Sequence, residues 1–362
     1  MKEVSLDVEG LTDVLTRIFT AAGGEGDEPA IIARNLVGAN LAGHDSHGVV
    51  RTQRYCEWVR DGVCHWGRHL ETVIDADAFA LVDGQMGFGQ SLGIETVALG
   101  LEKARKAGVS IIALRNAGHL GRIGEWAERA CAEGFVSIHF VNCYHSQLVA
   151  PFGGVGRAMG TNPVAIGMPV EGGDFILDFA TSTVAEGKVL VAKKGGKPLP
   201  DGALVGPDGG LTTDPDVLYG PLGPGELPNP SKGPGAITAM GLHKGSGLSL
   251  ACEMLAGALT GGGTCGPGYA FKNGMLSIYI DPARLDDGHG WAQSAKEYVS
   301  FVHSIKPRDP ESPVLVPGEP ERARRRERTP TMPLPAEAWE SILASGTNLG
   351  LDRTALAALA ER

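Results

Sequence analysis

The segment GHDSHGVVR, from Gly43 to Arg51, concentrates the residue types that can move a proton and hold a carboxylate. His47 and Arg51 are four residues apart, so on a helix they would share one face. An imidazole exchanges a proton near neutral pH, and a guanidinium can bind a carboxylate through two parallel hydrogen bonds. Ser46 or Asp45 could orient the imidazole. The spacing therefore predicts a site for a small acid beside an acid-base histidine.

The same segment permits two other interpretations. His44, Asp45 and His47 could hold a metal ion, which would make the protein a metal-dependent hydrolase. No further His or Glu completes a recognised ligand spacing, so we expect no metal site. The histidines could also hydrogen-bond within a buried helix junction, but the concentration of polar groups beside an arginine favours a functional site over this structural role.

Two glycine-rich segments have the composition of an anion site. Asn116–Gly124 carries His119 where an expected strand gives way to a helix, and Gly241–Gly247 carries Lys244 where an apolar helix begins. Backbone N–H groups at a helix start attract phosphate, so both segments could hold a dinucleotide. His119 could instead be the acid-base group or a cap. The order of residues around Lys244 does not match a Walker loop, which excludes a P-loop ATPase.

Two weaker signals accompany them. Thr161 and the stretch 177–182 (LDFATS) supply hydroxyls suited to a ribose or amide, although the same residues are common in turns. Gly87–Gly93 (GFGQSLG) imitates a Rossmann fingerprint, but its third glycine is one residue late. The next strand ends without an acidic residue, so an NAD-type Rossmann site lacks its ribose partner, while Arg115 would permit NADP.

Hydrophobic periodicity indicates a helical beginning, a mixed centre and a helical tail. We expect helices over 6–62, and a return to helix after Glu319 with Pro335 in a first turn. A loop dense in Pro and Gly is expected over 219–235. The central elements expected are strands over 79–82, 109–114, 135–141 and 274–280, and a helix over 92–106.

Composition excludes several classes of protein. A chain of 362 residues with a net charge of −10 lacks the coherent basic surface that nucleic acid requires. The six cysteines form no C-x-x-C pair, which argues against structural zinc and a disulfide framework. No stretch has the length and apolarity of a signal peptide core or membrane span. We expect a cytoplasmic protein with no membrane partner.

Several blocks taken together resemble the malate/L-lactate dehydrogenase family of the non-Rossmann type. They occur in family order and span nearly the whole chain, and their joint occurrence is specific although no single block is decisive. The blocks are SHGVVRTQRY (46–55), GHLGRIGEWA (118–127), GTNPVAIGMP (160–169), LDFATSTVAEGKV (177–189), GLHKGSGLSLACEMLAGALTGG (241–262) and PGEPERARRRER (317–328).

The resemblance implies an α/β fold of the α+β type, without a Rossmann domain. A largely antiparallel NAD(P)-binding sheet domain would occupy 76–309, including the 219–235 loop. A helical domain carrying the catalytic histidine would combine 1–75 with 310–362. Family members reduce 2-oxo acids, cyclic imino acids or sugar-acid ketones, or oxidise hydroxy acids, usually as homodimers.

The resemblance also implies roles for individual residues. His47 resembles the general acid-base group, Ser46 its orienting neighbour and Arg51 the ligand of the substrate carboxylate. His119 matches a position that binds cofactor in some members and accepts the proton in others, and Thr161 matches a contact to substrate or nicotinamide. The remaining matches to cofactor contacts are Leu120, Gly121, Arg122, Ile123, Phe179, Ala180, Thr181, His243, Lys244, Gly318 and Glu319.

These observations predict an oxidoreductase that uses NAD or NADP to interconvert a small 2-hydroxy acid and its 2-oxo acid. A cyclic imino-acid reductase of the same family, the metal-dependent hydrolase, and a nucleotide-sensing protein without catalysis are the alternatives. The lead into His119, Asn116–Gly118, and the long 219–235 loop depart from the family pattern, which leaves the substrate side chain open.

Overall fold

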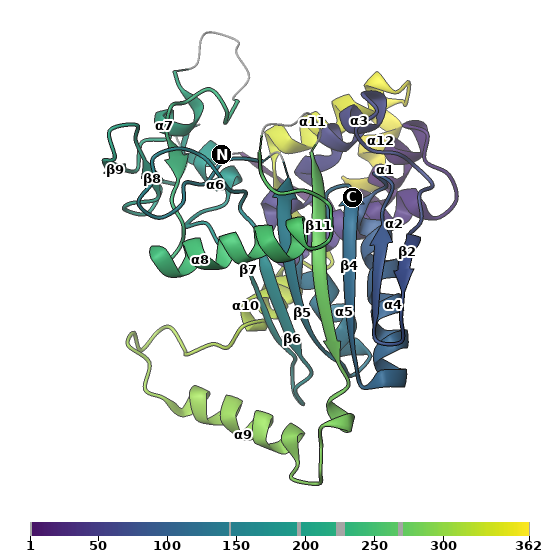
Figure 1. Cartoon of the computed structure of the whole chain (residues 1–362). Helices are drawn as coiled ribbons and strands as arrows, with labels where there is room; N and C mark the ends of the chain where they lie inside the picture. Colours follow the sequence, from purple (N-terminus) through teal and green to yellow (C-terminus); the bar gives the residue numbers. More distant parts are fainter. Residues whose placement is uncertain (1, 145, 194–196, 222–228, 267–270, 362) are drawn as a thin grey trace.

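A seven-stranded, mostly antiparallel sheet is the centre of the molecule in the computed structural model (Figure 1). The structure describes residues 2–144, 146–193, 197–221, 229–266 and 271–361. Only the β3–β4 pair is parallel among the sheet's described neighbours, so the expected antiparallel character is confirmed. In spatial order the strands are β2 (Glu71–Asp75), β3 (Phe79–Asp83), β4 (Val109–Ala117), β11 (Lys272–Ile280), β5 (Val136–Tyr144), β6 (Val164–Met168) and β7 (Phe175–Phe179).

Two helices cover one face of this sheet. Helix α4 (Gly89–Ala107) packs on β4 and β11, and α5 (Gly124–Ala132) packs on β5 and β6. Alternation along β4 explains the layering, because Ser110, Ile112 and Leu114 are buried while Val109 and Ile111 are exposed. One end of the opposite face is crossed by α8 (His243–Cys252) and the π-helical turn η3 (Glu253–Ala258) (Figure 1).

The two ends of the chain build one helical unit beside the sheet. Strand β1 (Glu3–Asp7) pairs with β12 (Thr331–Pro335), which joins the ends directly. One apolar core combines side chains from both ends, among them Leu15, Ile32, Trp339 and Leu356. The helices of this unit are α1 (Val8–Ala21), α2 (Glu28–Leu41), α3 (Thr52–Arg60), α11 (Ala336–Asn348) and α12 (Arg353–Ala360).

A smaller lobe has its own apolar core, which the sequence did not reveal. It includes Val149, Met159, Leu204, Tyr219 and Ile237. Part of the expected 219–235 loop, residues 222–228, lies outside the described residues. The lobe contains β8 (Leu204–Val205), β9 (Leu211–Thr212), β10 (Ala236–Ile237), α6 (Glu186–Lys193) and α7 (Asp216–Tyr219).

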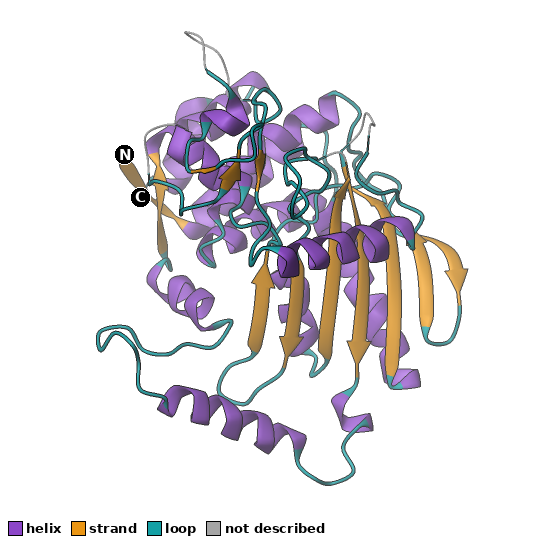
Figure 2. Cartoon of the chain, turned by 60° about the vertical axis from the view of Figure 1, so that its left-hand side comes forward, coloured by secondary structure: helices purple, strands orange, loops and turns teal. Residues whose placement is uncertain are grey.

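The prediction of a helical tail was incomplete. After α10 (Glu319–Glu327) the chain forms strand β12. Pro335 occupies the N-cap position of α11, directly before its first turn and not in it. Helix α9 (Trp291–Ser304) extends away from the end of the sheet (Figures 1 and 2) and buries none of its residues. No helix among the described residues is long and apolar enough to cross a bilayer.

The GFGQSLG segment does open a helix between two parallel strands, but its glycines serve packing. A Cβ added at Gly89 would lie 2.4 Å from the His119 carbonyl oxygen, and one at Gly93 would lie 2.4 Å from the Trp126 ring. Both approaches are too close for a side chain. Gly89 therefore brings the start of α4 against the turn that carries His119, and Gly93 brings α4 against α5.

Candidate active site

The His47 segment folds as two 3-10 turns, η1 (Asp45–His47) and η2 (Val49–Arg51), and not as the expected continuous helix. Gly48 separates them with extended backbone, because the Asn40 side chain occupies the space beside it and accepts from Val49 N at 2.7 Å. The prediction that His47 and Arg51 share a helix face was therefore wrong. They are tied differently: Arg51 Nε donates to the Ser46 carbonyl at 2.7 Å.

His47 and His119 face each other across the site. Their rings are stacked, with centroids 5.6 Å apart and planes 10° from parallel. His47 Nδ1 lies 3.1 Å from the Ser46 hydroxyl, and His119 Nδ1 lies 2.6 Å from the Tyr55 hydroxyl. The structure thus brings two predicted candidates together, although 72 residues separate them in the sequence.

The surroundings keep both imidazoles neutral. Burial, followed by the positive charge of Arg51, lowers the pKa of His47 to about 3. Burial and Arg51 also hold the pKa of His119 well below its ordinary value. Burial raises the pKa of Tyr55, so its hydroxyl remains protonated. Two neutral bases beside a guanidinium suit an anionic substrate that changes protonation at one oxygen.

The candidate ligands of the alternative metal site, His44, Asp45 and His47, interact with different partners. The Asp45 carboxylate accepts from Asn40 at 2.7 Å and from Arg328 at 2.6 Å, while His44 Nε2 lies 3.5 Å from Glu321. Over the described ranges, the only group with converging metal-ligand atoms is the exposed Asp286, Asp287 and His289. The geometry gives the hydrolase alternative no support.

The segment that follows His119 is internal. Leu120 and Ile123 belong to the core under the sheet. Arg122, 2% exposed, pairs with Glu128 at 2.5 Å and lies 3.9 Å from Asp178. Gly121 is also buried, with a left-handed φ of 71° beside Asn35. The predicted cofactor contacts of this segment would have to come from its backbone, and they stay predictions.

Thr161 and the end of β7 lie together. Thr181 is buried, and its hydroxyl donates to the Thr161 carbonyl at 3.1 Å and to the Asn162 carbonyl at 3.0 Å. Phe179 and Ala180, directly before it, are half-buried. The expected grouping of these residues is present, and their contact with cofactor remains a prediction.

His243 and Lys244 begin α8 and are exposed. Beside them lies a hollow lined by Phe152, Val155, Leu211 and Leu242. The ring centroids of Phe152 and His243 are 5.9 Å apart. A helix start, a lysine and an adjacent apolar hollow together fit a phosphate with a flat ring attached.

Gly318 and Glu319 begin α10, beside the start of β7. A Cβ at Gly318 would lie 2.9 Å from the Asp174 carbonyl, and the Glu319 carboxylate accepts from Val316 N at 2.8 Å. Neither residue contacts the histidine pair, whereas Glu321 in the same first turn lies 3.5 Å from His44 Nε2.

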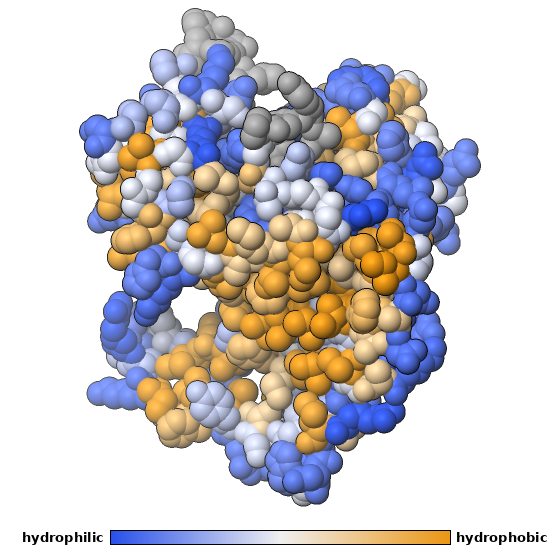
Figure 3. Space-filling model, viewed as in Figure 1, coloured by the Kyte–Doolittle hydropathy of each residue, from blue (hydrophilic) through white to orange (hydrophobic). Residues whose placement is uncertain are grey.

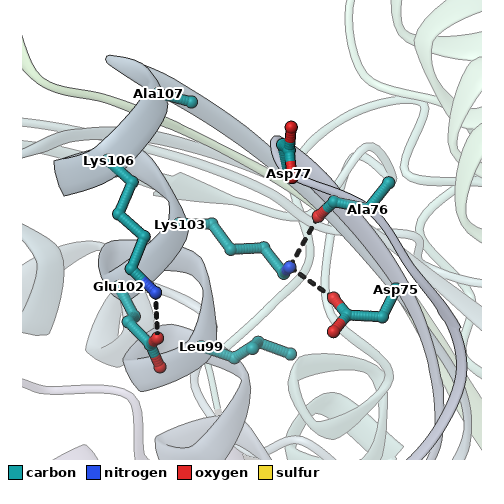
Figure 4. Close-up of a pocket in the computed structure, with 8 residues that line it drawn as sticks. All are labelled: Asp75, Ala76, Asp77, Leu99, Glu102, Lys103, Lys106 and Ala107. Carbon is teal, nitrogen blue, oxygen red and sulfur yellow. Dashed lines mark hydrogen bonds and ion pairs between the residues drawn. The ribbon is translucent and has the colours of Figure 1, made fainter.

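A second hollow, shown in Figure 4, lies between α4 and the β2–β3 turn. Lys103 fills it and donates to Asp75 at 2.5 Å and to the Ala76 carbonyl at 2.7 Å, while Lys106 pairs with Glu102. Lys103 is about 20 Å along α4 from its first turn, at 1.5 Å per residue. The Lys103 side chain therefore links α4 to the β2–β3 turn, and the hollow is remote from His47 and His119.

Sequence reasoning did not identify Gln90, Glu186 or Tyr219 as residues near the site. Gln90, in the first turn of α4, donates through Nε2 to the Tyr55 hydroxyl at 2.7 Å. Glu186 accepts a hydrogen bond from Tyr219, and a Cβ added at the neighbouring Gly187 would lie 3.1 Å from Ser46 Cβ. A polar residue inside the GFGQSLG run was the only available signal for Gln90.

Comparisons with known proteins agree with this site. A model of the malate/L-lactate dehydrogenase family matches residues 6–343. Hydroxycarboxylate dehydrogenase B of Escherichia coli K12 is 36% identical over 368 residues, which cover 98% of this chain and 97% of that protein. The solved sulfolactate dehydrogenase of Methanocaldococcus jannaschii superposes with a TM-score of 0.84 at 29% identity, covering 97% and 99%.

The Δ1-piperideine-2-carboxylate reductase of Pseudomonas syringae pv. tomato superposes with a TM-score of 0.81 at 29% identity, covering 95% and 100%. The chain belongs to the malate/L-lactate dehydrogenase family. It is a dehydrogenase that acts on hydroxy acids, and the expectation of an enzyme from this family is confirmed. A sensor without catalysis and a hydrolase are both excluded by this membership.

Proposed function

We propose that the protein is an NAD(P)-dependent oxidoreductase that interconverts a small 2-hydroxy acid and its 2-oxo acid at the site of Ser46, His47, Arg51 and His119. The observation that carries this proposal is the placement of a neutral, half-buried imidazole beside a guanidinium. Such a pair can hold a carboxylate while it handles the proton of the neighbouring oxygen.

In oxidation, neutral His47 takes the proton of the substrate C2 hydroxyl, and in reduction protonated His47 returns it to the developing alkoxide. Arg51 uses Nε for the Ser46 carbonyl, and no described residue bonds its two terminal nitrogens. Those nitrogens can grip the substrate carboxylate bidentately. The negative charge so bound offsets the effect of Arg51 on His47, which favours proton uptake by His47 during turnover.

A nicotinamide cofactor fits the residues around the site. The start of α8 with His243 and Lys244 would hold its phosphates, and the neighbouring hollow at Phe152 would take a flat ring. When bound, the cofactor supplies or accepts a hydride at C2 of the acid. Thr161 and Thr181 would border its reactive end.

The test follows NADH and NADPH absorbance with a panel of 2-oxo acids, 2-hydroxy acids and one cyclic imino acid. We expect turnover of a 2-oxo or hydroxy acid that falls about 10²- to 10⁴-fold in a folded His47→Gln variant. Turnover of the imino acid alone would assign the piperideine-carboxylate type of activity. Full activity of His47→Gln would refute the role of His47.

We also infer that the enzyme is a homodimer. On the sheet face that lacks α4 and α5, cross-strand register aligns an apolar row of Phe79, Ile111, Ile278, Ile138 and Ile166. Figure 3 shows apolar surface spread over this region. An apolar surface of this extent is typical of a subunit interface.

The neighbouring α9 supports the same inference, because Tyr298 and Phe301 are 68% and 59% exposed on a helix without buried residues. Sedimentation should give twice the chain mass, and Ile111→Lys should shift the protein toward monomer. Glu102→Lys, on the other side of the sheet, is the matched control. A wild-type monomer at micromolar concentration would refute the dimer.

A further inference from the structure

A chain of two hydrogen bonds, one buried and one partly buried, leads from α4 to His119. Gln90 Nε2 lies 2.7 Å from the Tyr55 oxygen, and that oxygen lies 2.6 Å from His119 Nδ1. Gln90 is 0% exposed and Tyr55 1% exposed. Hydrogen bonds in a setting of low dielectric constant are stronger than in water.

The order of donors and acceptors follows from the chemistry of the three groups. An amide nitrogen can only donate, so the Tyr55 oxygen accepts from Gln90. The single hydroxyl proton of Tyr55 is then free to donate to His119 Nδ1. A nitrogen that accepts a hydrogen bond carries no proton, and a neutral imidazole must therefore hold its proton on Nε2.

We propose that Gln90 and Tyr55 are positioning residues that fix His119 in its Nε2–H tautomer, so that His119 donates a hydrogen bond to an oxygen of the bound ligand and leaves proton transfer to His47. The inference rests on the proposed function and gives its two histidines different roles. His47 is the acid-base group, and His119 is a hydrogen-bond donor and not the base.

The surroundings make this arrangement rigid. Trp58 stacks on Phe271 with ring centroids 5.0 Å apart, and both rings border His119. No described residue forms a hydrogen bond with Nε2 of His119, whereas its Nδ1 lies against the Tyr55 hydroxyl. His47 differs, because its contact is the Ser46 hydroxyl, which can donate or accept as the protonation of His47 changes.

The test reads the tautomer directly in the full-length protein labelled with 15N-histidine. Long-range 15N–1H correlation spectra distinguish protonated from unprotonated ring nitrogens, and the His119→Gln variant assigns the signals. We expect His119 Nδ1 to be unprotonated and Nε2 protonated at neutral pH. A proton on Nδ1 would overturn the inference.

Gln90→Glu supplies the decisive variant, because it replaces the donor with an acceptor of the same shape. Once its new carboxyl is ionised, Tyr55 must donate to it, and the His119 proton should move to Nδ1. We expect the tautomer to switch over the pH range in which this carboxyl ionises, and kcat to fall in parallel by about 10²-fold, the usual effect of losing one positioned donor.

Gln293→Glu on α9 makes the same charge change elsewhere and should leave the tautomer unmoved. A His119 tautomer that stays the same in Gln90→Glu at every pH would also overturn the inference. The spectra need no turnover, so they test the role of His119 even if no acid in the panel is a substrate.

Discussion

Replacement of Arg51 by Gln tests the assignment of the carboxylate grip most directly. Two charge-assisted hydrogen bonds from its terminal nitrogens, at about 1.5–3 kcal/mol each, would be weakened or lost. Their sum of about 3–6 kcal/mol corresponds to about 10²- to 10⁴-fold in kcat/KM. We expect most of this loss in KM, because the carboxylate is bound in the ground state as well as in the transition state.

The same change should move the pH profile in a known direction. The charge of Arg51 is, after burial, the largest cause of the low pKa of His47, which is about 3. Its removal favours the protonated form and raises that pKa, by about 1–3 units for a neighbouring charge. Oxidation requires neutral His47, so the acidic limb of kcat/KM should move upward to about pH 4–6.

The assay measures kcat/KM for hydroxy-acid oxidation between pH 4 and 9 at saturating nucleotide, with circular dichroism to confirm the fold. Arg54→Gln is the control, because Arg54 lies one turn later, in α3, with a 60% exposed side chain and pairs only with Glu57 among the described residues. An Arg51→Gln enzyme with unchanged KM and an unmoved acidic limb would refute the assignment.

Three further predictions concern the scaffold. Burial lowers the pKa of His139 to about 3, so unfolding takes up a proton between pH 6.5 and 3 and the free energy of unfolding falls as the pH falls. In urea titrations, His139→Asn should reduce the slope of this free energy against pH by about 1.4 kcal/mol per pH unit. An unchanged slope would contradict this explanation. Gly93→Ala places a Cβ 2.4 Å from the Trp126 ring and should lower the free energy of unfolding by about 1–3 kcal/mol. Gly38→Ala is the control and should not lower it, because the nearest neighbour of its Cβ is 4.0 Å away. Equal urea midpoints for the two variants would disprove the packing role of Gly93. Lys103→Met should change stability by less than about 1 kcal/mol, because an ion pair to a largely exposed carboxylate contributes little, and a large loss would show a stronger tether.

The sequence predicted the main strands and helix α4 correctly, and the role of Ser46, His47 and Arg51 stays a prediction. It failed where local pattern and tertiary packing disagree. The expected helix is interrupted at Gly48, where the backbone is extended and the Asn40 side chain leaves no room for a Cβ. Strand β12 contains Pro333 and was hidden, since a proline is tolerated only where no ladder donor is required.

Contacts between distant residues were also beyond local analysis. Gln90 and Tyr55 lie 35 residues apart, and nothing in their immediate neighbours marks them as partners. Their meeting depends on Gly89, which lets the start of α4 approach the His119 turn. Residue types and spacing marked His119 and several cofactor segments, and the resemblance to a family added roles for them, whereas Gln90 and Tyr55 as partners of His119 emerged only from the three-dimensional structure.

The pairing of β1 with β12 has a consequence for biosynthesis. Residues 3–7 are made long before their partner strand, 331–335. The core that supports the His47 turns also needs Trp339 and Leu356. Until these residues are made, the N-terminal helices lack part of the core against which they pack. We expect nascent chains that stop before residue 331 to be inactive and to need chaperone protection.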